Sequence, residues 1–413
     1  MNNQAEGTKE VVSWLRQPET IRMQARRLYA LALEDKLAHF KLEPAALDKA
    51  VDLVIAVTRQ NYPKLDVPYH SRWRHFSVNN FDRIKAWQLT TGKLDSLEWG
   101  QRLYELVIIS VLVDAGAGDK WRFHDQQTGQ VLTRSEGLAI ASLELYLGGH
   151  LSCDPDSPYR VDGERLLQIT PHTLASVFQV SAENPLNGLE GRATLLNKLG
   201  AAICQSPQHF GGQSRLGGFF QSVIEKQQQR QIAARDIFSA VLTAFSPIWP
   251  TRSTWQGESL GDVWPHSALR GDRAQDELVP FHKLSQWLSY SLVEPLEEAG
   301  IAVTGLDELT GLPEYRNGGL FIDLGALAPR HDSLLREPQD PTSEPIVEWR
   351  ALTLVLLDEL AVKMREALSS DAKSLPLAKV LQGGSWAAGR LIASKKRRDG
   401  APPIQIISDG TIF

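Results

Sequence analysis

Two short segments of this 413-residue chain contain charged side chains that could form part of a ligand-binding or catalytic site. Lys283 begins an apolar, helix-like stretch, and Glu314 stands before Tyr315 in a segment that ends with two glycines. A carboxylate between a proline and a tyrosine, in a loop that ends with two glycines, could be held rigidly and face a ligand. The alternative for Glu314 is an ordinary turn with an ion pair to Arg316.

A third segment, residues 114–121, is rich in glycine and follows an apolar run. Glycines end a helix and free the backbone for a loop. The carboxylates of Asp114 and Asp119, with the ring of Trp121, could there bind a polar ligand. The alternative is helix capping with a lysine–aspartate pair at the surface.

Cationic and aromatic side chains alternate in residues 72–76, where Arg72, Arg74 and His75 lie. Guanidinium groups can pair with phosphate oxygens while aromatic faces stack on a base. Arginines that extend around a packed tryptophan would give the same pattern, so both interpretations stay open.

Composition and motifs argue against several classes of protein. Ten scattered histidines and two cysteines show no metal-binding spacing and no disulfide framework. The sequence contains no phosphate loop and no dinucleotide fingerprint. A net charge of −5 provides no basic field for nucleic acid. We expect no metal, no organic cofactor and no nucleic-acid partner.

No apolar run approaches the ~18 residues that a membrane-spanning helix needs, and the N-terminus has no apolar signal segment. We therefore expect a cytoplasmic protein that does not bind membranes. Its expected partner is a small molecule, and the sequence does not indicate an oligomeric state.

Helical periodicity dominates the chain, and strand patterns are few. The predicted helices fall within residues 1–60 and over 97–113, 134–147, 163–180, 191–205, 219–231, 282–299 and 344–368. Pro295 should disturb the last turns of its helix. Short strands are expected at 131–132 and in the tail, 403–413. Residues 247–280 form the longest irregular region, and such a loop is expected to line a site, with Trp255 as one wall.

The fold class expected from these patterns is mostly α. We predict a single helical domain over residues 1–413, with an N-terminal helical part in residues 1–60 and two lobes around a cleft.

Residues 113–121, 134–139 and 312–319 resemble the uracil-catabolism family of bacteria and fungi known as the Urc-four or Urg-three type. The resemblance runs from about residue 63 to the C-terminus. A more distant resemblance is to the queuosine salvage proteins, through the order Phe281-His282-Lys283, Gln286 and Glu314-Tyr315-Arg316. Those proteins are nucleotide N-glycosidases, and the resemblance implies a DNA-glycosylase-like (queuosine-salvage-like) architecture. This chain has Glu and His where that family has Asp and Tyr, and residues 249–280 form an insertion.

These two resemblances imply hydrolysis of the C–N bond in ribosylurea or its 5′-phosphate, which would release urea and ribose or ribose phosphate. Glu314 would stabilise the ribose cation or orient water. Asp114 and Asp119 would share this role or accept hydrogen bonds from urea. The leaving nitrogen would receive its proton or hydrogen bond from Lys283, His282 or Arg316.

The remaining candidates would bind the substrate. The cations expected near a 5′-phosphate are Arg72, Arg74 and Lys283, with His75 beside them, and the expected pocket walls are Trp121, Trp255 and Tyr315. Two alternatives stay open. One is an amidohydrolase or deaminase acting on a ring-opened ureido intermediate, and the other is a ligand-binding subunit without catalytic activity.

Overall fold

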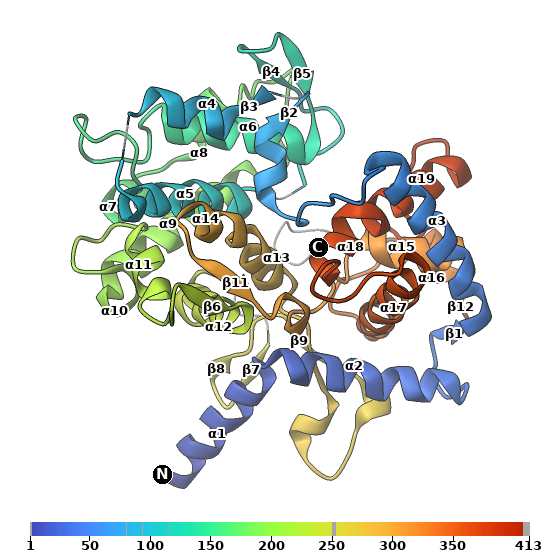
Figure 1. Ribbon diagram of the computed structural model, residues 1–413. Coiled ribbons are helices and arrows are strands. Elements are labelled where there is room, and N and C mark those ends of the chain that lie inside the picture. Colours follow the sequence, from blue (N-terminus) through green and yellow to red (C-terminus); the bar gives the residue numbers. More distant parts are fainter. Residues whose placement is uncertain (1, 80, 93, 115, 250–252, 408–413) are drawn as a thin grey trace.

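The computed structural model describes residues 2–79, 81–92, 94–114, 116–249 and 253–407, and helices make up most of it (Figure 1). This confirms the expected mostly-α fold. The helices of the first part of the chain are α1 (Asn2–Leu15), α2 (Pro18–Leu33), α3 (Leu47–Asn61), α4 (Arg83–Thr90), α5 (Ser96–Leu112), α6 (Arg134–Leu147), α7 (Gly163–Leu166), α8 (Pro171–Val177), α9 (Leu189–Gln205), α10 (Pro207–Phe210) and α11 (Gly218–Ile224).

The later helices are α12 (Ala234–Phe245), α13 (Lys283–Ser291), α14 (Val293–Glu298), α15 (Tyr315–Asp323), α16 (Ser333–Arg336), α17 (Glu344–Leu368), α18 (Leu377–Val380) and α19 (Trp386–Lys396). A π-helical turn, Leu381–Ser385, joins the last two.

The strands of the described chain are short and form separate two-stranded pairs. The antiparallel pairs are β1 (Phe40–Leu42) with β12 (Leu327–Pro329), β2 (Ser77–Val78) with β3 (Phe81–Asp82), β4 (Phe123–Asp125) with β5 (Gln130–Leu132), β7 (Thr254–Trp255) with β8 (Glu258–Ser259), and β9 (Val263–Pro265) with β10 (Leu278–Pro280). The parallel pair is β6 (Gln231–Ala233) with β11 (Ala302–Thr304).

Helices with regular apolar spacing and a clear start lie where the sequence predicts them. The helix predicted over residues 97–113 is α5, whose first turn is capped by Asp95 through a hydrogen bond from the Glu98 backbone N–H at 2.8 Å. An N-cap carboxylate satisfies amide groups that have no partner inside the helix. The predictions over residues 134–147 and 344–368 are likewise confirmed as α6 and α17.

Three predicted helices are shorter in the structure. Residues 163–180 form two helices because Pro171 begins the second one, and residues 282–299 divide at Leu292, three residues before Pro295. A proline lacks the N–H that a continuous helix would bond to the preceding turn. The prediction that residues 219–231 continue as one helix is wrong, because α11 ends at Ile224 and Gln231 begins β6.

The strand predicted at residues 131–132 is confirmed within β5. In the tail, Ile406 makes an isolated bridge to Gln339, and residues 408–413 lie outside the described residues. The irregular region 247–280 contains the β7–β8 and β9–β10 pairs.

Two large hydrophobic clusters organise the described chain. One is built mainly by α4–α11, and the other by α2, α3 and α15–α19. Helices of the two groups lie on the left and right of Figure 1, with α13 between them. Both α12 and α13 contribute to each cluster. In α13, Leu288 packs in the first cluster and Tyr290 in the second. Trp287 contacts both clusters, so α13 marks their junction.

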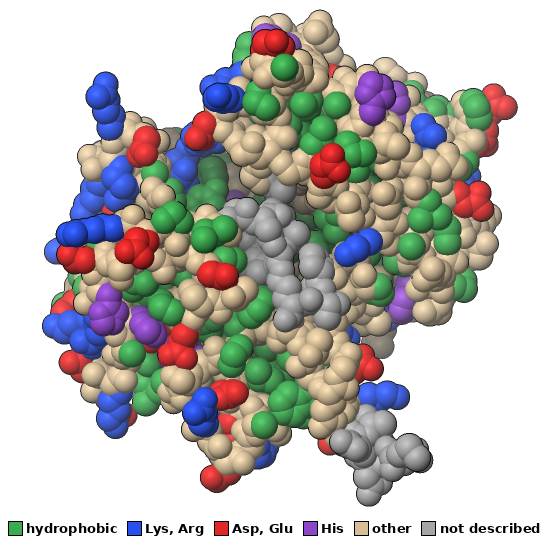
Figure 2. Space-filling model, turned by 180° about the vertical axis from the view of Figure 1, so that it is seen from behind, with side chains coloured by type: hydrophobic (Ala, Val, Ile, Leu, Met, Phe, Trp, Pro, Cys, Tyr) green, Lys and Arg blue, Asp and Glu red, His purple; other side chains and the backbone are tan. Residues whose placement is uncertain are grey.

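The surface carries charges of both signs. On the face in Figure 2, lysine and arginine side chains are interspersed with aspartate and glutamate. None of the helices in the described ranges is both long and apolar enough to cross a membrane.

Candidate active site

Lys283 is the first residue of α13, and a carboxylate from the long loop holds this helix end. Asp262 accepts a hydrogen bond from the Lys283 backbone N–H at 3.1 Å. The same carboxylate accepts hydrogen bonds from both terminal nitrogens of Arg350, at 2.8 and 2.7 Å. A two-point arginine–carboxylate pair has a defined geometry. The start of α13 is therefore fixed against α17.

Glu314 caps the N-terminus of α15. Its two carboxylate oxygens accept hydrogen bonds from the backbone N–H groups of Arg316, at 2.7 Å, and Asn317, at 2.6 Å. The arginine side chain does not form the ion pair expected of an ordinary turn, because its guanidinium donates to the Gly400 carbonyl oxygen at 2.8 Å and lies over the Tyr315 ring. The Glu314 carboxylate is thus held in one orientation at the positive end of a helix.

Asp114 directly follows the C-cap of α5 and forms an ion pair with Arg72, with 2.9 Å between Oδ2 and Nη1. The Arg72 side chain is fully buried, and its Nε donates to the Ser110 hydroxyl at 2.7 Å. The backbone N–H of Arg72 also donates to the Ser291 hydroxyl at 3.0 Å. The segment 72–76, a 3₁₀ helix, is thereby joined to the end of α13.

Electrostatic interactions connect these three segments. The pKa of Lys283 is lowered from 10.5 to about 8, mainly by burial and also by the positive charge of Arg350. The negative charges of Glu314, Asp262 and Asp114 oppose this shift, and Glu314 has the largest effect of the three. The structure therefore brings Lys283, Glu314 and Asp114 into one electrostatic neighbourhood, although they are far apart in the sequence.

The carboxyl groups respond to the same surroundings. Burial raises the pKa of Glu314, while its two backbone hydrogen bonds and Lys283 lower it. Burial also raises the pKa of Asp114, against the effect of Arg72. The pKa of Tyr315 is raised by burial and by the charge of Glu314. Glu314 and Tyr315 are nevertheless half-buried rather than fully enclosed.

A cluster of three aromatic rings lies next to the Arg72–Asp114 pair. The centroid of the His75 ring lies 6.4 Å from that of the Trp287 ring, and the centroid of the His70 ring lies 4.9 Å from it. Burial and the nearby Arg72 hold the pKa of His75 well below its usual value, so this imidazole is neutral. These rings provide a partly exposed apolar wall at the junction of the two clusters.

Two other predicted residues have partners outside this neighbourhood. Arg74 forms an ion pair with Glu294, whose pKa is raised by burial from 4.5 to about 7. The His282 Nε2 lies 3.1 Å from the Leu15 carbonyl oxygen, and burial lowers the pKa of this imidazole to about 4. His282 is therefore neutral and directed toward the end of α1.

Three predicted residues are placed elsewhere. Trp121 is fully buried in the first cluster, where its ring N–H donates to the Phe178 carbonyl oxygen at 2.9 Å, so it is a core residue rather than a pocket wall. Asp119 is exposed on its loop. Trp255 packs against a small cluster beside α1 that includes Leu260 and Leu278.

Asp262 belongs to the long loop expected to line a site, but no individual role was predicted for Asp262, Arg350 or Trp287. One signal was available for Trp287, because it follows Lys283 by one helical turn and residues four apart share a helix face. Nothing in the local sequence indicates that Asp262 and Arg350 form a pair, since they belong to a loop and a helix that are distant along the chain.

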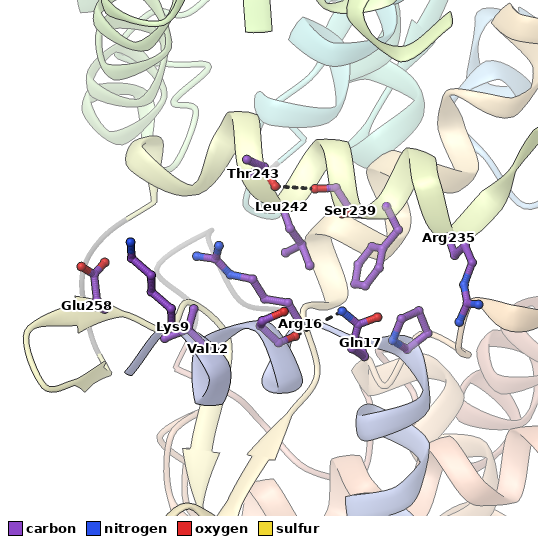
Figure 3. Close-up of a pocket in the computed structure, with 12 residues that line it drawn as sticks. Lys9, Val12, Arg16, Gln17, Arg235, Ser239, Leu242, Thr243 and Glu258 are labelled. Atoms are coloured by element: carbon purple, nitrogen blue, oxygen red, sulfur yellow. Dashed lines mark hydrogen bonds between the residues drawn. The ribbon is translucent and has the colours of Figure 1, made fainter. Parts of the chain in front are cut away.

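A separate pocket of about 310 Å³ lies between α1, the start of α2 and α12 (Figure 3). Its charged side chains are Lys9, Arg16, Arg235 and Glu258. None of the predicted site residues lines it, although Glu258 comes from the long loop. Within the described ranges, no group of three or more His, Cys, Asp or Glu side chains is placed to hold a metal ion.

Comparisons with known proteins cover nearly the whole chain. It is 40% identical over 412 residues to "Protein urg3" of Schizosaccharomyces pombe, and the alignment covers 98% of this chain and 99% of that protein. It is 39% identical over 407 residues to "Uracil catabolism protein 4" of Lachancea kluyveri, covering 91% and 92% of the two chains. The resemblance to this family is thereby confirmed. Residues 14–413 also match one family model, and the chain belongs to that family, described as "Protein of unknown function (DUF1688)".

Proposed function

We propose that this protein acts in uracil catabolism as an N-glycosidase, which hydrolyses the bond between ribose and urea in ribosylurea or its 5′-phosphate. The name of a relative that is 39% identical, "Uracil catabolism protein 4", supports the pathway. The observation that carries the reaction class is the electrostatic interaction of Lys283 with Glu314, since the charge of each shifts the pKa of the other. A proton donor beside a fixed carboxylate is what this hydrolysis requires.

The reaction exchanges one bond for another. The bond between ribose C1′ and the urea nitrogen breaks, and its electron pair goes to the nitrogen, which takes up a proton. The oxygen of a water molecule forms the new bond to C1′ and loses a proton. Urea and ribose, or ribose 5-phosphate, are the products, and the reaction needs no oxidant or reductant.

Glu314 would act on the carbon side of this bond. Positive charge develops on the ribose ring as the nitrogen leaves, and a fixed carboxylate stabilises that charge or orients the attacking water. Each Glu314 oxygen uses one lone pair for a backbone N–H and retains another. The helix cap thus positions the carboxylate and leaves it able to act.

Lys283 would act on the nitrogen side. Urea is a poor leaving group as an anion, so it must be protonated as it departs. With a pKa of about 8, the Lys283 ammonium is mostly protonated at neutral pH and donates its proton more readily than an ordinary lysine. Asp114, whose charge also acts on Lys283, is the third member of this group.

The unphosphorylated substrate is favoured by the state of the two arginines expected to bind a 5′-phosphate. Arg72 is paired with Asp114, and Arg74 with Glu294. Each guanidinium already has a carboxyl partner, which a phosphate group would have to displace.

The test is urea release from synthetic ribosylurea and from its 5′-phosphate, followed in a coupled assay. We expect release by the wild-type protein and a loss of at least about a hundredfold in Glu314→Gln. Glutamine keeps one of the two acceptor oxygens of the helix cap, and its NH₂ group cannot accept the second backbone hydrogen bond, so the folding of this variant is measured alongside its turnover. The exposed Glu337, at the end of α16, provides the control Glu337→Gln, which should retain full turnover.

Two results would contradict the proposal. Normal turnover by folded Glu314→Gln would remove the role of this carboxylate. No urea from either compound would exclude the reaction. Ammonia release from a ring-opened ureido compound would then identify the protein as a deaminase or amidohydrolase, and binding without turnover would identify a ligand-binding subunit.

A further inference from the structure

The ion pair between Arg72 and Asp114 leaves one polar atom of each side chain unused. The pair joins Nη1 to Oδ2, and in the described part of the chain Arg72 Nη2 and Asp114 Oδ1 are buried and make no hydrogen bond. Buried polar atoms are nearly always paired in folded proteins. A donor and an acceptor left open on the same ion pair therefore point to a ligand that pairs with both.

The Arg72 guanidinium is held so firmly that its open nitrogen has a fixed position. Nε donates to the Ser110 hydroxyl at 2.7 Å, and Nη1 donates to the Ser135 carbonyl oxygen at 3.1 Å. Ser110 in turn accepts a hydrogen bond from the Ser142 hydroxyl at 2.7 Å. A donor fixed in advance loses little freedom when a ligand binds.

The acceptor belongs to the same neighbourhood as the proposed catalytic groups. The charge of Asp114 acts on both Lys283 and Tyr315. Its side chain is 12% exposed, whereas that of Arg72 is 0% exposed, so of the two side chains only that of Asp114 is in contact with solvent.

We infer that Arg72 and Asp114 bind the amide edge of a ureido group, with Nη2 donating to the carbonyl oxygen and Oδ1 accepting an N–H on the same side. The inference rests on the proposed function, in which the ureido group leaves. The terminal NH₂ of ribosylurea has one N–H on the same side as its carbonyl oxygen, which matches the donor and acceptor. Asp114 thereby determines specificity for ureido compounds over simple amides.

The experiment compares two ligands of nearly equal shape. N-acetylribosylamine carries a methyl group where ribosylurea carries the terminal NH₂, and it keeps the carbonyl oxygen. Binding is measured by calorimetry in Glu314→Gln, so that slow turnover does not consume the ligand. We expect ribosylurea to bind about tenfold to a hundredfold more tightly, the effect of one hydrogen bond to a charged group.

The second comparison adds Asp114→Asn to this background. The amide oxygen is a weaker acceptor than the carboxylate, so the preference for ribosylurea should fall at least about fivefold. The control is Asp332→Asn, because Asp332 forms an exposed pair with Arg336 at the same 2.9 Å distance. That control should keep the full preference.

Equal binding of the two ligands in Glu314→Gln, or a preference unchanged by Asp114→Asn, would overturn the inference. If Asp114→Asn does not fold, a third ligand tests the inference in Glu314→Gln. Ribosylurea that carries two methyl groups on its terminal nitrogen has no N–H there, so it must bind as weakly as the acetyl compound. Preference for ribosylurea without urea release in the wild type would refute only the proposed function. No binding of either compound would refute both.

Discussion

Asp262 and Arg350 form a two-point ion pair across 88 residues of sequence, with nitrogen–oxygen distances of 2.8 and 2.7 Å. The guanidinium also lies over the Phe281 ring, 4.0 Å from its centroid. Burial alone would raise the pKa of Asp262, but Arg350 holds it far below its usual value. Since the same carboxylate caps α13, this pair determines where the helix begins and where Lys283 lies.

Replacing Asp262 with asparagine should destabilise the protein strongly. The Arg350 side chain is only 1% exposed, and removing one partner of a buried pair leaves an uncompensated charge. We expect the free energy of unfolding to fall by about 3–5 kcal/mol, measured by chemical denaturation. Asp276→Asn is the control, because it removes an exposed pair with Arg273 in the same loop and should change stability little. Equal effects of the two substitutions would contradict this account.

The rate of urea release should fall as the pH rises above about 8, where Lys283 loses its proton. If the protonated amine is the general acid, the rate declines about tenfold for each further pH unit. Arginine keeps its charge at every accessible pH, so Lys283→Arg should abolish this decline, whatever its absolute rate. The measurement is the pH–rate profile of both proteins. The same decline in both would assign it to another group.

Glu294 should make stability depend on pH between 4.5 and about 7. Because burial raises its pKa, the folded protein binds more protons than the unfolded chain in this range, and stability falls as the pH rises. The total is at most about 3 kcal/mol. Relative to wild type, Glu294→Gln should gain stability across this range, measured by denaturation at several pH values. A constant difference between the two proteins would show that Glu294 does not titrate there.

Gly318→Ala should displace α15 and the residues at its start. A Cβ at this position would lie 2.7–2.8 Å from atoms of the Trp349 ring. Such overpacking costs about 1–3 kcal/mol of stability, and turnover should fall as Glu314 moves. Gly191→Ala, in α9, is the control, because no atom lies within 4 Å of its added Cβ. It should stabilise the protein by about 0.5–1 kcal/mol. If Gly318→Ala kept the turnover and stability of the wild type, the added Cβ would not displace α15, and the prediction would be wrong.

The sequence by itself determined most of the helices and the chemistry that the site could contain. Apolar spacing and local start signals set α5, α6 and α17, because these features act within a few residues of each other. The breaks near Pro171 and Pro295 are also local, although their full extent was not expected. Lys283, Glu314 and Asp114 could be named because charged residues beside glycines and aromatic residues suggest a ligand site, and the family resemblances implied their acid–base roles.

Only the tertiary structure decided which of these groups meet. The pairs Asp262–Arg350 and Arg72–Asp114 join segments that are distant in the chain, and no local pattern encodes such pairings. Trp121 shows the same limit, since an aromatic residue in a glycine-rich loop suits either a pocket wall or the core. Burial in the first cluster and a hydrogen bond to the Phe178 carbonyl oxygen made it a core residue. Burial, which sets the pKa values of Lys283 and Glu314, likewise depends on how the two hydrophobic clusters come together at α13.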